Sequence, residues 1–158
     1  GRSRFAAWRL METAVFREVR GNVKKYAATQ ITHLLTKETT PAYGRYRLLH
    51  HMVKPRRARD GRMFRYVDGW SEGDREMLVA ALQECLKIPA IELVLISLYA
   101  MWVLVKDSKR VAEIGRKMIG PKMPAAVSEA LSQLREGTVS DIPVSKIWET
   151  PWNEQAPY

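Results

Sequence analysis

The chain is poor in the residues from which catalytic and metal sites are usually built. It has one cysteine, Cys85, among 158 residues, so it can form no internal disulfide and cannot hold zinc through paired cysteines. Of its three histidines, His50 and His51 are adjacent and point in different directions on any regular element. No Cys or carboxylate stands at metal-ligand spacing from them. We therefore expect no metal site, and we expect Cys85 to be a reduced, buried thiol.

Motifs for catalysis are also missing. The sequence contains no glycine-rich phosphate loop, no nucleophile elbow and no paired carboxylates. We therefore expect a non-enzyme with no catalytic residues and no cofactor. Glu92 is a candidate because an acidic residue inside an apolar run is often functional, for example in a proton pathway. The favoured interpretation is simpler: its side chain reaches the edge of the apolar run or pairs with a cation of a neighbouring subunit.

The positive charge is unevenly distributed along the chain. The formal net charge is +9. Residues 44–66 contain eight of the Lys and Arg residues and one acidic residue, Asp60, whereas residues 67–158 have more acidic than basic residues. Such asymmetry indicates that the amino-terminal part faces something anionic: RNA, phospholipid head groups or an acidic protein surface.

Apolar periodicity predicts a mainly α protein in which amphipathic helices flank one transmembrane helix, with long irregular arms. Ser71 or Asp74 can cap a helix after Trp70, and acidic residues fill its first turn. The predicted segments are: amphipathic helix or helices at 1–37, a basic irregular arm at 38–70, a capped helix at 71–87, the span at 88–105, short helices at 106–137 and an aromatic, proline-rich tail at 138–158.

The basic arm, residues 38–70, shows no sustained period and several turn signals. A long segment without regular structure is unusual inside a self-sufficient domain, so we expect a partner to order it. Aromatic side chains among its arginines suit stacking on RNA bases or binding in a protein groove, and both remain open. The predicted partner contacts in the arm and the tail are Tyr43, Arg56, Arg57, Arg59, Phe64, Trp70, Trp148 and Trp152.

The longest apolar run is IPAIELVLISLYAMWVLV, residues 88–105, with lysines at both ends. Eighteen helical residues are about 27 Å long, close to the roughly 30 Å of a hydrocarbon core. A transmembrane helix is therefore predicted, with a fully buried helix of a soluble domain as the alternative. The residues assigned to the span are Ile88, Glu92, Leu95, Tyr99, Trp102 and Val105.

Several short motifs occur in a familiar order. They are Pro41-Ala42-Tyr43, WSEGDREML at 70–78, the run at 88–105, Val111-Ala112 with Lys117-Met118, and SDIPVSKIWETPWNE at 140–154. This order resembles the cytochrome c oxidase subunit IV family. Residues 1–40 have no counterpart there, and 121–138 is inserted. The resemblance implies a structural subunit without cofactors, with its amino-terminal region in the matrix and its tail in the intermembrane space.

These observations favour a non-catalytic, single-pass accessory subunit of a respiratory complex in the mitochondrial inner membrane. Cytochrome c oxidase is the preferred complex, and ATP synthase or complex I also fits. Its partners would be other subunits of that complex, with phospholipid head groups at the basic arm. The total positive charge of the amino-terminal region favours placing that region in the matrix. Close to the span, however, more Lys and Arg residues follow it than precede it, which favours the opposite topology, so the orientation stays open. The chain begins with Gly1, which indicates a cleaved targeting segment or an expression remnant.

Two alternatives come from other classes. The first is a soluble, basic RNA-binding protein such as a mitochondrial ribosomal subunit, with residues 44–66 laid along phosphates. The second is a helical scaffold whose helix 88–105 is buried by a protein partner.

Overall fold

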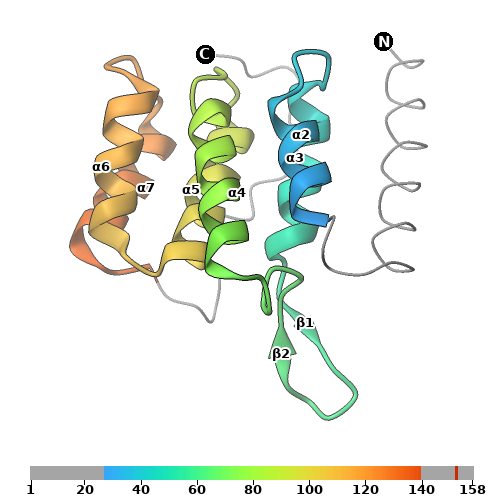
Figure 1. The fold of residues 1–158 in the computed structure, drawn as a ribbon. Helices are drawn as coiled ribbons and strands as arrows, with labels where there is room; N and C mark the ends of the chain where they lie inside the picture. Colours follow the sequence, from blue (N-terminus) through green and yellow to red (C-terminus); the bar gives the residue numbers. More distant parts are fainter. Residues whose placement is uncertain (1–26, 140–151, 153–158) are drawn as a thin grey trace.

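Helices make up most of residues 27–139, which together with Trp152 are the residues described by a computed structural model of the chain (Figure 1). The predicted helix within residues 1–26 and the predicted contact at Trp148 lie outside these residues. The elements are α2 (Ala27–Thr36), α3 (Ala42–Val53), β1 (Arg56–Arg57), β2 (Met63–Phe64), α4 (Glu72–Cys85), α5 (Ile91–Val105), α6 (Ser108–Ile119) and α7 (Ala125–Glu136).

Helix α5 is the centre of the bundle. It packs against α3, α4, α6 and α7, and every side chain from Glu92 to Leu104 is buried. A helix that is covered by neighbours on all sides is expected to be apolar all round, because no face of it meets water. The neighbouring helices therefore explain the low polarity of this segment.

The predicted transmembrane helix at 88–105 is wrong. No helix in the described part of the chain is both long enough and apolar enough to cross a membrane. The apolar run is divided, because the N–H of Ile88 donates to the Cys85 carbonyl at 3.1 Å in a turn and Ala90 is extended. What remains is a helix of 15 residues, about 22 Å long, which ends at Lys106 in the left-handed conformation.

Most residues assigned to the span are core residues. Leu95, Tyr99 and Trp102 are buried in the middle and last turns of α5, and Glu92 is buried in its first turn. Ile88 and Val105 are partly buried and pack against the core from either end. The core thus extends over the whole of α5.

The prediction of an irregular arm is also wrong for residues 42–53, because these residues form helix α3. Pro41 is extended at the N-cap, and its fixed φ suits a helix start. Leu48, Leu49, Met52 and Val53 are buried at three- and four-residue spacings. Helix α3 packs on α5 and so supplies apolar surface that the sequence prediction did not count.

Helices α4 and α6 begin at side-chain caps. The Ser71 hydroxyl accepts a hydrogen bond from the Asp74 N–H at 3.2 Å, and the Asp107 carboxylate accepts one from the Arg110 N–H at 3.1 Å. Each cap satisfies an amide that would otherwise lack a partner at the helix start. Ser71 is one of the two capping residues that the sequence offered.

Helix α6 packs closely against its neighbours at Gly115. A Cβ atom at this position would lie 2.6 Å from Cδ2 of Leu131 in α7 and 3.0 Å from Cδ2 of Leu98 in α5. Both distances are too short for an ordinary side chain without movement of these leucines. The contact brings α6 and α7 together and determines the space between them.

Candidate nucleic-acid interface

A β-hairpin projects beyond the ends of the helices (Figure 1). We call residues 54–65 the basic hairpin. Its strands are antiparallel, with Arg56 opposite Phe64 and Arg57 opposite Met63. The loop is closed by an N–H of Ala58 that donates to the Arg62 carbonyl at 2.8 Å. Gly61 has φ +86, a conformation that glycine adopts without the strain a side chain would add.

Two arginines bind the base of the basic hairpin to the helices. Nη2 of Arg56 donates to Nε2 of His51 at 2.9 Å. Nε of Arg65 donates to the Val53 carbonyl at 3.0 Å, and its Nη2 donates to the Tyr99 hydroxyl at 2.9 Å. These side chains connect the hairpin to α3 and α5. We therefore assign Arg56 and Arg65 a structural role in positioning the hairpin.

The remaining cations of the basic hairpin face solvent. Lys54, Arg57 and Arg59 are exposed, and none of their side chains forms a hydrogen bond or ion pair with any residue that the structure describes. Arg62 is 82% exposed, but its Nε lies 2.8 Å from a carboxylate oxygen of Asp60. The basic hairpin thus presents three uncompensated positive charges together, and these can bind phosphate oxygens without breaking an existing ion pair.

Two apolar side chains are exposed between these cations. Met63 is 44% and Phe64 is 43% exposed. Adjacent residues of a strand point to opposite faces, so the two side chains do not combine into one apolar patch. Phe64 lies opposite Arg56, and its exposed ring is available for stacking on a planar group such as a base.

Apart from Phe64, the aromatic residues predicted as partner contacts lie outside the basic hairpin. The rings of Tyr43 and Trp152 contact each other edge to face with centroids 5.6 Å apart, and Trp152 also packs on Tyr46. Trp70 is buried in the core. Tyr43 is in the first turn of α3, whereas the basic hairpin follows the last turn. Of the predicted contacts, the structure brings Arg56, Arg57, Arg59 and Phe64 together in the basic hairpin, and it brings Tyr43 and Trp152 together at α3.

Groups with potential chemistry are isolated from one another. No cluster of three or more His, Cys, Asp or Glu side chains suited to a metal ion occurs among residues 27–139 and Trp152. Burial raises the pKa of the Cys85 thiol to about 11, so its nucleophilic thiolate form is suppressed. Glu92 is buried in the first turn of α5.

The individually predicted partner contacts did not include Lys54, Arg62 or Met63, although all three lie within residues 44–66, which the RNA-binding alternative placed along phosphates. The signal for them was Asp60-Gly61, a turn dipeptide, with the short runs 56–57 and 63–64 on either side. Strands of two residues are too short to show an alternating pattern, so the flanking runs were not recognised as paired.

The chain matches no protein-family model, no curated protein and no solved structure.

Proposed function

We propose that this chain is a non-catalytic RNA-binding protein whose contact surface is the basic hairpin. The observation that carries the proposal is the group of exposed, uncompensated cations Lys54, Arg57 and Arg59 on a projecting hairpin. The guanidinium group is planar and donates two parallel hydrogen bonds to phosphate oxygens. Because these cations have no partner within the described part of the chain, binding a phosphate breaks no existing ion pair there.

RNA is favoured over a lipid surface by the arrangement of the apolar groups. Insertion into a bilayer needs an apolar face that is continuous, whereas Met63 and Phe64 point to opposite faces of the hairpin. A single exposed ring beside guanidinium groups suits stacking on an unpaired base. The two side chains therefore agree with an RNA contact.

Membership of a respiratory complex remains a prediction with less support. It rested chiefly on residues 88–105 as a span, and that feature is now a buried helix of the bundle. The remaining support for membership of a respiratory complex is the order of short motifs in the sequence. The mitochondrial location and the partner subunits are likewise still predictions, and the RNA proposal depends on none of them.

The salt dependence of binding tests the proposal. We would measure the affinity of the full chain for a fluorescent, single-stranded RNA of mixed sequence by anisotropy over a salt series. With about three phosphates neutralised, the slope of log K against log[salt] should be about −2. In the double variant Arg57→Gln/Arg59→Gln the slope should become shallower by about 1.4, because two phosphate contacts are lost.

The matched control is Lys109→Gln/Lys117→Gln. It removes the same charge from α6, where both lysines are exposed. This control should keep the slope of the natural chain. A flat salt response, or equal losses in the two double variants, would overturn the proposal, since binding would then follow total charge. Binding to anionic vesicles without binding to RNA would replace RNA by phospholipid.

A further inference from the structure

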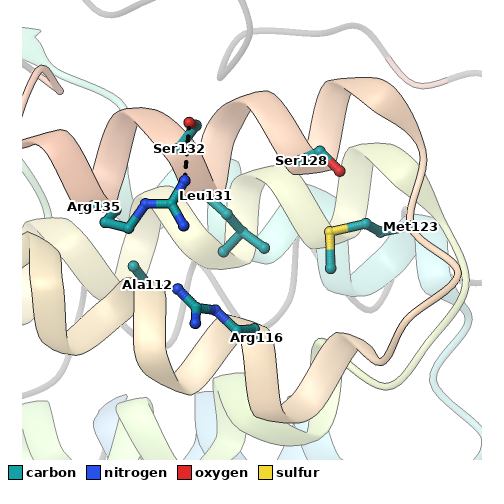
Figure 2. Close-up of a pocket in the computed structure, with 7 residues that line it drawn as sticks. All are labelled: Ala112, Arg116, Met123, Ser128, Leu131, Ser132 and Arg135. Atoms are coloured by element: carbon teal, nitrogen blue, oxygen red, sulfur yellow. Dashed lines mark hydrogen bonds between the residues drawn. The ribbon is translucent and has the colours of Figure 1, made fainter.

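A pocket of about 210 Å³ lies between α6 and α7. It is smaller than the pockets of about 300–1,000 Å³ that hold drug-sized ligands, so we expect a small ligand here. Figure 2 shows side chains from both helices around it. The lining residues are Ala112, Arg116, Met123, Ser128, Leu131, Ser132 and Arg135.

Two arginines line this pocket from opposite sides. Arg116 comes from α6 and Arg135 from α7 (Figure 2). Nη2 of Arg135 donates to the Ser132 hydroxyl at 3.4 Å. The Arg116 side chain has no hydrogen bond or ion pair with any described residue, and both arginines are exposed. None of the lining residues is acidic. The two positive charges are therefore not neutralised within the pocket.

The rest of the lining divides into a polar and an apolar part. Ser128 and Ser132 supply hydroxyl groups, which both donate and accept hydrogen bonds. Leu131 and Met123 supply apolar surface beside them (Figure 2). Two guanidinium groups with hydroxyls suit a doubly charged, oxygen-rich anion. The apolar part suits a small organic substituent on that anion.

The backbone on both sides of the pocket is held in place. Gly115, next to Arg116, packs so closely against Leu131 and Leu98 that an added Cβ would require the ends of these leucine side chains to move. Helix α7 ends at Gly137, whose N–H donates to the Leu134 carbonyl at 3.2 Å. The packing of α6 on α7 therefore holds the backbones that carry the two arginines, and a ligand has to order only their exposed side chains.

We propose that this pocket binds a small phosphomonoester. The phosphate would lie between the guanidinium groups of Arg116 and Arg135 near the serine hydroxyls, and the organic group would lie against Leu131 and Met123. The site is separate from the basic hairpin and does not depend on RNA binding there.

Calorimetry with phenyl phosphate tests this inference. The full chain should bind it saturably with a stoichiometry of one. Arg116→Gln and Arg135→Gln should each weaken binding at least tenfold, because each removes one charged pair of hydrogen bonds to the phosphate. Lys117→Gln is the matched control: it removes an exposed neighbouring cation that does not line the pocket, and it should bind as the natural chain does.

Further ligands and one further measurement check the assignment. Phenol should not bind, and inorganic phosphate should bind more weakly because it lacks the apolar group. The inference is overturned by the absence of saturable binding, by equal losses in Lys117→Gln and the arginine variants, or by binding of phenol as tight as that of phenyl phosphate. It is also overturned if inorganic phosphate binds equally well, or if Arg116→Gln lowers RNA affinity, since the arginines would then belong to the RNA surface.

Discussion

At the scale of single residues, Cys85 shows what burial does to one side chain. Its Sγ lies 4.0 Å from the carbonyl oxygen of Leu35 in α2, and the side chain is fully buried. Loss of hydration is the main cause that raises its pKa to about 11, although Arg45 lowers it and Glu84 raises it further. The sequence correctly predicted a buried thiol, since a lone cysteine within an apolar helix face has few other roles.

This pKa predicts a specific loss of stability in alkali. The thiol ionises near pH 9.0 when the chain is unfolded and near 11 when it is folded. Its contribution is therefore complete below pH 9 and declines from pH 9 to 11, where only the unfolded chain releases the proton. At pH 10.5 the free energy of unfolding should have lost about 2 kcal/mol from this group.

Urea unfolding of the natural chain and of Cys85→Ala at pH 8 and pH 10.5 measures this loss. The substitution removes the titrating group, so the gap in the free energy of unfolding between the two proteins should shrink at pH 10.5. A gap that stays constant would mean that the thiol ionises equally in both states.

Two helical glycines should respond in opposite ways to a larger side chain. Gly115→Val should lower the free energy of unfolding by about 1–3 kcal/mol, because its Cβ would meet Leu131 and Leu98 in a packed region. Gly73→Ala in α4 should raise it by about 0.5 kcal/mol, since the nearest atom to the added Cβ is 4.0 Å away and alanine favours the helix. Thermal unfolding of both variants is the measurement, and a stabilised Gly115→Val would contradict the close packing of α6.

At the scale of elements, the sequence predicted some helices better than others. The start of α4 was visible because Ser71 precedes an acidic first turn. Helix α3 was missed because Arg45, Arg47 and the His50-His51 pair interrupt its apolar residues, although Leu48 and Met52 have helical spacing. A period is hard to recognise when polar residues occupy half of a short helix. Only contact with α5 shows which face of α3 is buried.

The Tyr99 hydroxyl group is one of the groups that attach the basic hairpin to the helices. Tyr99→Phe removes the hydrogen bond that Arg65 Nη2 donates to it at 2.9 Å while keeping the ring beneath the guanidinium group. We expect a loss of about 1–2 kcal/mol of stability, because a partly buried charged donor loses its partner. We also expect faster amide exchange in the hairpin, measured by mass spectrometry. Unchanged exchange there would show that the remaining contacts of Arg65 are sufficient.

At the scale of the whole molecule, the apolar run 88–105 could not be assigned from its own residues. A transmembrane helix and a helix buried on all sides have the same composition, so the answer depends on how much apolar surface the neighbours provide. That surface comes from α3 and α4, which precede α5 in the chain, and from α6 and α7, which follow it; together they enclose α5. The uneven charge, in contrast, was readable at once, because charge does not depend on folding.

The central claim is that RNA contacts the basic hairpin, and hydrogen exchange of the full chain with and without single-stranded RNA tests it most directly. Residues 54–65 contain Lys54, Arg57 and Arg59 and project from the bundle. Bound RNA should therefore slow amide exchange in peptides from this segment and leave peptides from α6 and α7 unchanged. Unchanged exchange in the hairpin, with slowing at α6 and α7, would contradict the account and place the RNA contact elsewhere.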